Sequence, residues 1–385
     1  MKIAEEERTA DVRRPFPILH INSAHTWRGG EQQTLWLCQG LLRRGHKIFL
    51  ACQPGSDLHQ KGEATGIAVC PVVMRGEWDI WAVRELIGLI RQHSVEIVHF
   101  HTAHAHALGL LAAQLAKVPI RVLTRRVDFH IHRHPLNRWK YGSGLTAIIA
   151  ISEGIRDVLI QDGLAPERVT TVYSGIDLQR IENVGNGSYV RDEFDISEDT
   201  LLIGIVGALA PHKDHRNFLE AAAIVKQSVP DVRFLIVGDG ELRAELEWVS
   251  TTQGLSADVI FTGFREDVLE ITKTMDIFVL SSYLEGMGTV ILDAMALGRP
   301  VVATKVGGIP EIVQHEKNGL LVPARNPGKL AEAILKLVNN PSLRAQMGAQ
   351  GREQVKRYTL ERTVEGAEAV YFRALSQLNS SHLKA

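Results

Sequence analysis

The sequence alternates short apolar runs with longer amphipathic stretches, and this alternation constrains the fold more than any other feature. Strands separated by helices at such spacing form βαβ units, which predicts an α/β fold with a parallel sheet covered by helices on both faces. In the first half the strand candidates are Phe16–Ile21, Lys47–Cys52, Ile67–Val73, Glu96–Phe100, Ile120–Thr124, Ala147–Ile151 and Val169–Tyr173. The helix candidates between them are Glu31–Arg44, Trp78–Gln92, Ala105–Lys117 and Glu153–Gln161.

A second series of alternating strands and helices begins at Leu201 and continues to the C-terminal segment 358–385. Because 385 residues exceed one ordinary core, we expect two doubly wound domains, 16–177 and 201–357, whose crevices face each other as a deep cleft. The polar stretch 178–200 resembles an interdomain linker, residues 1–15 a flexible lead-in, and 358–385 a C-terminal segment. The strand candidates are Leu201–Gly207, Val232–Val237, Val259–Thr262, Asp276–Leu280 and Pro300–Ala303. The helix candidates are Asp214–Lys226, Gly240–Thr252, Glu266–Thr274 and Val290–Leu297.

Composition excludes several functional classes. A formal net charge of −1 argues against generic nucleic-acid binding, which requires a basic excess. Cys38, Cys52 and Cys70 are scattered and form no CxxC pair, so we expect buried thiols in a reducing compartment. No targeting signal and no long uncharged apolar run are visible, which predicts a cytoplasmic protein without a membrane-spanning helix.

The stretch Ser281–Val313 carries the clearest chemistry. It reads as the end of a strand, a loop with Gly286 and Gly288, and then a helix that opens at Thr289. Glycines let the backbone approach a ligand, and the free N–H groups of a first helical turn attract anions. This arrangement predicts a phosphate site.

Two carboxylates frame that phosphate site: Glu285 in the loop, and Asp293 about one turn into the helix. Because an acid repels a diphosphate, both are better suited to hydroxyl groups of a ribose or a sugar. The pattern therefore favours binding of a nucleotide-diphosphate sugar.

Other loops follow strands on the same predicted rim. Lys213 stands before the Asp214 helix, where an ammonium group can neutralise a diphosphate, although a loop lysine is more often only solvated. The loops 238–241 and 262–267 are candidate walls of a base pocket, with ordinary βα turns as the equal alternative. In the first half, Gly30 belongs to a glycine loop before a helix, a weak anion-site signal.

Seven histidines gather at the end of one strand of the first half, at the start of the helix that follows it, and after the next strand. The most specific hypothesis for these histidines is a metal site, but no acid or cysteine joins them at ligand spacing, so we expect no metal. His101, just beyond a strand, is best placed to bind a sugar hydroxyl, and surface or capping roles suit most of the others. The seven are His99, His101, His104, His106, His130, His132 and His134.

The segment 125–141 is basic and aromatic. It fits an anionic acceptor or an anionic membrane surface, and equally a solvated face. The acceptor-binding candidates are Arg125, Arg126 and His130.

Taken together, these motifs resemble the retaining glycosyltransferases of family 4, which have the GT-B fold. The resemblance covers the chain from Ile18 to the C-terminal helix. It is carried by EGMGTVILDAMALGRPVVATKVGGIPEIV and NGLLVP, supported by HFHTAHAHALG, ISEGIRD, VYSGID, HKDH and VGDGE.

The resemblance implies roles for individual residues. Glu285 would contact the transferred sugar, Lys213 the diphosphate and Asp293 the ribose, while His101 and Gly30 would close the cleft from the acceptor domain. Glu285, His101 and Lys213 are the implied catalytic residues. The implied donor-binding residues are Gly30, Gly207, Lys213, Gly238, Gly263, Glu285, Gly286, Met287, Gly288, Thr289 and Asp293. The segment Tyr358–Leu378 resembles the final helix that returns to the N-terminal domain.

Two positions depart from the family pattern. Asp293 stands where glutamate is usual, and Ala208 stands where an arginine usually follows the strand glycine. One cation is therefore missing beside the diphosphate, and Arg216 is a candidate substitute.

The resemblance implies metal-independent transfer of a sugar, with retained configuration and no cofactor, from a nucleotide sugar to a glycan or lipid-linked acceptor. Bacterial surface polysaccharide or lipopolysaccharide synthesis is the expected setting, in the cytoplasm or at the inner face of the membrane. A nucleotide-sugar epimerase of the same architecture and a non-catalytic nucleotide-sugar-binding protein remain open alternatives. A dehydrogenase is disfavoured because no GxGxxG fingerprint is present.

Overall fold

The computed structural model describes residues 14–131 and 134–382, which form two compact units. The first unit contains the chain up to Tyr173 and again from Leu360, and the second unit contains Ser174–Thr359. The expected lead-in, 1–15, lies almost wholly outside the described residues.

The first unit is built on a seven-stranded sheet in the order β3-β2-β1-β4-β5-β6-β7, in which every neighbouring pair is parallel. Its strands are β1 (Pro17–Asn22), β2 (Lys47–Cys52), β3 (Ala68–Pro71), β4 (Ile97–Phe100), β5 (Ile120–Arg125), β6 (Ala147–Ala150) and β7 (Val169–Thr171). Its helices are α2 (Gly29–Arg43), α3 (Asp57–Glu63), α4 (Ile80–Gln92), α5 (Ala103–Leu115), α6 (Pro135–Arg138), η1 (Trp139–Ser143), α7 (Glu153–Gln161), η2 (Pro166–Arg168) and α17 (Leu360–His382).

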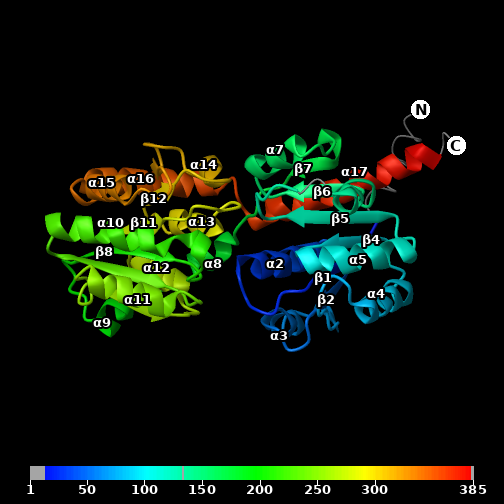
Figure 1. Ribbon diagram of the computed structural model, residues 1–385, viewed down its shortest axis with the longest axis horizontal. Coiled ribbons are helices and arrows are strands. Elements are labelled where there is room, and N and C mark those ends of the chain that lie inside the picture. Colours follow the sequence, from blue (N-terminus) through cyan, green and yellow to red (C-terminus); the bar gives the residue numbers. More distant parts are fainter. Residues whose placement is uncertain (1–13, 132–133, 383–385) are drawn as a thin grey trace. The chain divides into compact units, whose positions relative to one another are not determined.

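The second unit has a six-stranded parallel sheet in the order β10-β9-β8-β11-β12-β13. Figure 1 labels β8, β11 and β12 of this sheet. Its strands are β8 (Leu201–Val206), β9 (Val232–Val237), β10 (Val259–Gly263), β11 (Ile277–Leu280), β12 (Val301–Thr304) and β13 (Gly319–Val322). Its helices are α8 (Leu178–Glu182), α9 (Ser188–Glu193), η3 (Pro211–Lys213), α10 (His215–Ser228), α11 (Arg243–Thr252), α12 (Val268–Thr274), α13 (Thr289–Ala296), α14 (Ile309–Ile312), α15 (Pro327–Val338) and α16 (Pro341–Val355). The prediction of two doubly wound parallel sheets is confirmed.

The central strands are buried and mostly apolar because helices cover both faces of each sheet; buried polar residues of the first sheet include His20 and Asn22 on β1 and His99 on β4. β4 and β11 are buried at every position, and the core of the second unit joins strand residues to the inner faces of α10 and α15.

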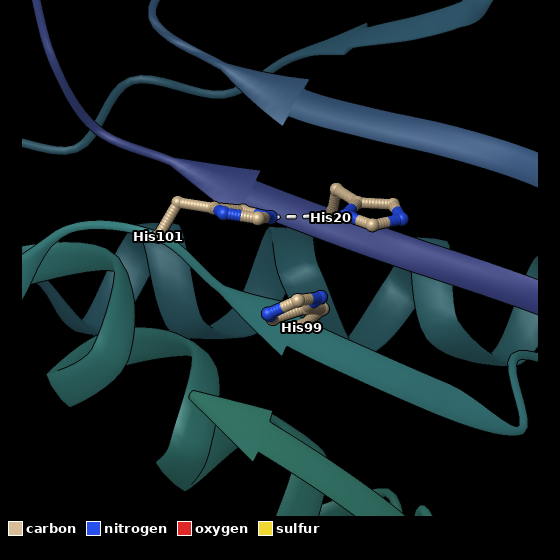
Figure 2. Close-up of side chains that lie close together, drawn as sticks. All are labelled: His20, His99 and His101. Carbon is tan, nitrogen blue, oxygen red and sulfur yellow. Dashed lines mark hydrogen bonds between the residues drawn. The ribbon is translucent and has the colours of Figure 1, made fainter. Parts of the chain in front are cut away.

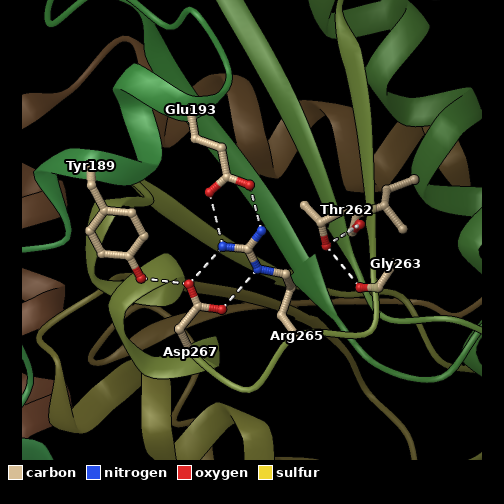
Figure 3. Close-up of polar contacts among 7 residues, drawn as sticks. Tyr189, Glu193, Thr262, Gly263, Arg265 and Asp267 are labelled. Carbon is tan, nitrogen blue, oxygen red and sulfur yellow. Dashed lines mark hydrogen bonds and ion pairs between the residues drawn. The ribbon is translucent and has the colours of Figure 1, made fainter.

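The stretch 178–200, for which we expected an interdomain linker, contains α8 and α9, and both belong to the second unit. An ion-pair network fastens α9 to the segment before α12 (Figure 3). The Arg265 guanidinium donates to Glu193 of α9 and, at 2.8 Å, to Oδ1 of Asp267, while the Tyr189 hydroxyl donates to Oδ2 of Asp267. The Arg265 bonds hold the pKa of Asp267 down, at about 2.

The last long helix, α17, packs against the first unit, to which it belongs. Gly40 of α2 gives it room, because a Cβ there would lie 2.3 Å from Cγ2 of Val364. Glu368 accepts from Arg44 and lies 2.9 Å from Nε2 of His46, while the Tyr371 hydroxyl is buried against His99. Helix α2 and strand β4 are thus both in contact with α17, near the end of the chain.

Candidate functional site

Each sheet has one point where the strand order reverses, and the predicted site residues follow the strands at these points. The chain moves outward from β1 through β2 to β3 and then returns to β4, and it does the same from β8 to β11. In doubly wound sheets the crevice beyond the carboxyl ends of such strands binds ligands. Lys213 follows β8, Glu285 follows β11, Gly30 follows β1 and His101 follows β4.

In the second unit, Lys213 and Glu285 meet although they are far apart in sequence. Nζ of Lys213 lies 2.5 Å from Oε2 of Glu285, and both side chains are largely buried, with 17% and 14% of their surface exposed. The Ser282 hydroxyl also donates to Oε2, at 3.2 Å. Glu285 is therefore held in one orientation, with its charge balanced by an ammonium group that a diphosphate would share.

Hydrogen bonds between the two loops fix this pair. The Ser281 hydroxyl donates to the carbonyl oxygens of Lys213, at 3.0 Å, and Asp214, at 2.9 Å. The backbone N–H of Tyr283 donates to the carbonyl oxygen of His212, at 3.0 Å. Asp214 has a left-handed backbone, with φ of 51°, which turns the chain from η3 into α10. The placement of Lys213 thus depends on the loop after β11.

The glycine loop after Glu285 ends at the N-terminus of α13. Gly288, with φ of 70°, occupies the N-cap position, and no side chain caps the helix there. The N–H of Ile291 donates to the carbonyl oxygen of Gly288, at 2.9 Å, whereas the N–H groups of Thr289 and Val290 precede the helical hydrogen bonds and can bind an anion. Met287 is buried, and the carbonyl oxygen of Gly286 accepts the N–H of Gly308, which secures the loop to the segment before α14.

Asp293 lies on α13, one turn beyond that N-terminus. Its residue is partly exposed, but its Oδ1 atom is buried and has no hydrogen-bond partner among the described residues. Burial raises the pKa of its carboxyl to about 6, and the Arg180 charge partly opposes this shift. A buried acceptor without a donor is well suited to a ligand hydroxyl group.

The glycines at the ends of β8, β9 and β10 allow their backbones to approach one another. A Cβ on Gly238, which has φ of 134°, would lie 2.1 Å from the carbonyl oxygen of Gly207. The N–H of Gly238 donates to the carbonyl oxygen of Gly263, at 2.9 Å. The Lys213 side chain extends over Gly207, since a Cβ there would lie 3.8 Å from its Cδ.

In the first unit, Gly30 lies beside Arg126. A Cβ on Gly30 would lie 3.6 Å from Cδ of Arg126. Desolvation lowers the pKa of the Arg126 guanidinium to about 10, while nearby Glu31 opposes the shift. Glu31 is itself oriented by Nδ2 of Asn22, at 3.2 Å, and by the N–H of Arg28, at 3.1 Å. A cation is therefore positioned where the β1 and β5 loops converge.

A cluster of three buried histidines lies at the switch point of the first sheet (Figure 2). Nδ1 of His20, on β1, lies 2.9 Å from Nε2 of His101, while His99 contacts the Tyr371 and Thr124 hydroxyls at 2.6 Å each. Burial lowers the pKa of all three imidazoles, to about 3 for His20, so they are neutral near pH 7. The outer atoms, Nε2 of His20 and Nδ1 of His101, are buried and have no partner among the described residues.

Because both rings are neutral, one proton lies in the His20–His101 hydrogen bond. If Nδ1 of His20 carries it, Nδ1 of His101 must be protonated and is a donor; in the other tautomer that atom is an acceptor. The position of the proton in the His20–His101 bond therefore determines whether Nδ1 of His101 is a donor or an acceptor. His20 was not predicted from the sequence, because a single histidine inside an apolar run resembles an ordinary strand residue.

The spacing of this cluster would also suit a transition metal. Among the described residues, His20, His99 and His101 offer ligand nitrogens within 4.8 Å of one another. Both ring nitrogens of His99 are engaged by the Tyr371 and Thr124 hydroxyls, and the Arg126 charge that lowers the pKa of His99 and His101 would also repel a dication. The donor set therefore fits a metal poorly, and we derive no chemical step from one.

The other acceptor-binding candidates already have partners within the first unit. Arg125 donates to the carbonyl oxygen of Phe129, at 2.6 Å, and its guanidinium lies 5.7 Å from the Tyr141 ring centroid. His130 is exposed and lies 2.9 Å from Oδ1 of Asp162. Both side chains brace the segment after β5 and would have to share their contacts with an acceptor.

The structure also locates cations near the Lys213 loop. Arg216 pairs with Glu245 of α11, at 2.6 Å, so it is occupied away from Glu285. Arg325, which follows β13, instead lies 4.1 Å from the Tyr283 ring centroid and acts electrostatically on Asp214. The sequence reading missed Arg325, although its position directly after a strand was an available signal.

No helix within residues 14–131 and 134–382 combines the length and apolar character needed to cross a bilayer.

Comparison with known proteins adds information on ancestry. Residues 190–354 match the family model described as glycosyl transferases group 1, and residues 27–180 match the model for glycosyltransferase family 4. Together the two matches span most of both units.

Several curated relatives are glycosyltransferases. The chain is 29% identical over 303 residues to the putative glycosyltransferase EpsD of Bacillus subtilis, covering 75% of this chain and 79% of EpsD. It is 27% identical over 278 residues to the UDP-Gal:alpha-D-GlcNAc-diphosphoundecaprenol alpha-1,3-galactosyltransferase of Escherichia coli, covering 69% and 72% of the two chains. It is 27% identical over 312 residues to the capsular polysaccharide biosynthesis glycosyltransferase CapM of Staphylococcus aureus, covering 76% and 80%.

Among solved structures, Anabaena Alr3699/HepE in complex with UDP and glucose superposes with a TM-score of 0.83 at 21% identity, covering 92% of this chain and 99% of that one. This likeness shows the fold, which is GT-B. The two family matches and the two Rossmann-like sheets lead to one assignment: the chain belongs to the group 1 glycosyltransferases of family 4.

Proposed function

We propose that this glycosyltransferase moves a sugar from a nucleotide-diphosphate sugar to a glycan or lipid-linked acceptor, with retention of anomeric configuration. The expected setting is the synthesis of a bacterial surface polysaccharide or lipopolysaccharide. The observation that carries the proposal is the Lys213–Glu285 pair, which lies at the switch point of the second sheet beside the N-terminus of α13.

Within this proposal the donor diphosphate binds between Lys213 and the first turn of α13 at Thr289. An ammonium group and free backbone N–H groups both stabilise the charge that develops on a leaving diphosphate. The backbone of Gly286, Met287 and Gly288 lies close to the donor in this proposal. The exposed guanidinium of Arg325 is the cation best placed to compensate for Ala208.

Asp293 binds the donor ribose in this scheme. Its buried, unpartnered Oδ1 accepts a ribose hydroxyl, and a carboxylate is the stronger acceptor of the two protonation states. The loops that carry Gly207, Gly238 and Gly263 form the walls around the base, because their side-chain-free backbones leave room for a planar ring.

Glu285 contacts the transferred sugar. The bond between the anomeric carbon and the diphosphate oxygen breaks, and a bond from that carbon to the acceptor oxygen forms on the same face. The acceptor proton passes to the departing phosphate oxygen, so no separate protein base is required. Lys213 balances the negative charge of the products, and closure over the reacting groups excludes water.

The first unit supplies the acceptor side. His101 and Gly30, at the switch point of the first sheet, are the residues of this unit that we propose to contact the donor, and Arg125, Arg126 and His130 bind an anionic acceptor group such as a lipid diphosphate. The diphosphoundecaprenol-linked acceptor in the name of the E. coli relative supports this acceptor class. The name of CapM supports a polysaccharide setting, and the UDP and glucose of the HepE complex support a UDP-sugar as donor.

We place the reaction in the cytoplasm, with peripheral contact at the inner face of the membrane. Cys38, Cys52 and Cys70 are free thiols, which suits a reducing compartment. We also propose that no metal is required, because Lys213 and the α13 N-terminus perform the charge stabilisation that a metal would otherwise supply.

The donor half of the proposal is tested by a thermal-shift panel of uridine, guanosine and adenosine diphosphates and their sugars. The cognate donor at 100 times its dissociation constant should stabilise the protein by about 2.7 kcal/mol. Lys213→Ala should greatly reduce the shift, whereas Lys329→Ala, an exposed lysine on α15, should preserve it. If no nucleotide stabilises the protein, or if both variants respond like the wild type, the donor site is assigned wrongly.

A further inference from the structure

Two tryptophans and an isoleucine protrude from one short segment of the first unit. Trp78, Ile80 and Trp81 are 85%, 72% and 67% exposed, and Val73 on the preceding loop is 45% exposed. Single exposed apolar side chains are ordinary, but large ones gathered within a few positions mark an interaction surface. We call Trp78, Ile80 and Trp81 the tryptophan knuckle.

The tryptophan knuckle is held in place by its neighbours. The carboxylate of Asp79 accepts the backbone N–H groups of Arg75, Trp81 and Ala82 and so caps α4. Glu77 pairs with Nζ of Lys140, at 3.3 Å, which fastens the loop to η1. The apolar side chains are therefore presented outward by an ordered backbone, as a preformed binding surface requires.

The position of the knuckle relates it to the acceptor. The segment 72–79 leaves the carboxyl end of β3 and enters α4, so it lies at the same edge of the first sheet as Gly30 and His101. Its partner Lys140 belongs to the segment that also carries Arg125 and Arg126. The surface is thus continuous with the side of the unit assigned to the acceptor.

The charges around the knuckle favour an anionic surface. Arg75, Arg84 and Arg138 are exposed cations on the neighbouring segments. Of the acids, Glu77 is paired with Lys140 and Asp79 is bound by backbone N–H groups, while the exposed Glu85 offsets one positive charge. The exposed apolar side chains thus lie among a small excess of exposed positive charge.

We propose that the tryptophan knuckle inserts into the headgroup region of an anionic lipid bilayer and presents the acceptor edge of the first unit to a lipid-linked substrate. Tryptophan is suited to this depth because its ring has an apolar body and a polar N–H, and basic residues beside it bind anionic headgroups. The inference rests on the proposed lipid-linked acceptor. It identifies the membrane contact with residues 73–84, in addition to the basic segment 125–141.

The test uses the full-length protein with vesicles of phosphatidylcholine alone and with added phosphatidylglycerol. Sedimentation should show binding to the anionic vesicles, with a blue shift of tryptophan emission. Trp78→Ala/Trp81→Ala should weaken this binding by at least about tenfold and remove most of the blue shift. Trp248→Ala is the matched control, because Trp248 is 64% exposed on α11 of the second unit, and it should bind like the wild type.

Equal vesicle binding by the double variant and the Trp248 variant would overturn the inference. So would a wild-type protein that ignores vesicles but changes from dimer to monomer in Trp78→Ala/Trp81→Ala, since the knuckle would then be a protein interface. Transfer to a water-soluble acceptor analogue is measured in parallel and should be the same in all three proteins. If none of the three proteins transfers sugar but vesicle binding still depends on Trp78 and Trp81, the enzymatic proposal is refuted and the membrane contact is supported.

Discussion

Replacing Asp293 by asparagine should stabilise the protein and weaken donor binding at the same time. Burial raises the pKa of this carboxyl from 3.8 to about 6. The folded protein therefore retains the proton up to about pH 6, whereas the unfolded chain loses it near pH 4. The contribution of Asp293 to stability is therefore most favourable below pH 4 and is lost as the pH rises through 6.

The pKa shift determines the size of the effect. A shift of roughly two units corresponds to about 3 kcal/mol of destabilisation above pH 7, and to roughly half of that at pH 5. Asparagine keeps the shape and removes the ionisation. The stability gained by Asp293→Asn should therefore be larger at pH 8 than at pH 5 by about 1 to 1.5 kcal/mol.

Urea denaturation at the two pH values measures this difference, with pulse proteolysis following the second unit. Burying the asparagine amide also changes the free energy of unfolding. This change is the same at both pH values, so it cancels when the two are compared. Donor affinity at pH 8 should fall by roughly tenfold to a hundredfold, the value of a hydrogen bond to a charged acceptor. A stability change that is equal at pH 5 and pH 8 would refute the burial argument, and unchanged donor affinity would refute the ribose assignment.

Three further predictions follow from the same structure. Asp267→Asn should destabilise the protein by roughly 1–2 kcal/mol at pH 7, because Arg265 lowers the pKa of Asp267 to about 2. This penalty should shrink as the pH falls from 4 toward 2. A penalty that denaturation experiments find independent of pH would contradict the ion-pair network. Gly238→Ala should lower the free energy of unfolding by at least about 3 kcal/mol, because its Cβ would lie 2.1 Å from a carbonyl oxygen. Gly254 has φ of 73° but open space around it, so Gly254→Ala should lower it by only about 1 kcal/mol. Equal thermal denaturation of the two variants would refute the close approach at the strand ends. Dialysis against EDTA should leave the rate of sugar transfer unchanged, because the cluster of His20, His99 and His101 fits a cation poorly; a loss of activity restored by zinc would assign that cluster a catalytic metal.

The architecture was accessible from the sequence because its signals are local. Buried parallel strands are continuous apolar runs, and the glycines and polar residues that follow them identify the carboxyl edge. Helix α3 was missed, since its sequence is polar, contains Gly62, and begins at a serine cap that a turn would equally use. The helices α8 and α9 were missed because short polar segments acquire structure only by packing. Arg265 and Asp267 hold α9, and Ile181 of α8 packs against Leu269 and Leu297.

The contacts within the site were less accessible than the residues themselves. Lys213 and Glu285 were both identified by their places after strands, but their ion pair depends on β8 and β11 being neighbours in the sheet. The bond between His20 and His101 depends in the same way on β1 lying beside β4. Such pairings are set by strand order, which no local pattern specifies.

The central claim is that Lys213 and Glu285 form the reaction centre of a sugar transferase that retains configuration. The direct measurement is NMR of the product formed from the cognate nucleotide sugar and a lipid-linked acceptor, with rates for Glu285→Gln and Lys213→Ala beside the exposed controls Glu332→Gln and Lys329→Ala. We predict a product with the anomeric configuration of the donor, rates reduced by at least about a hundredfold in the first two variants, and full rates in the controls. A product of inverted configuration, or full transfer by both Glu285→Gln and Lys213→Ala, would contradict the account.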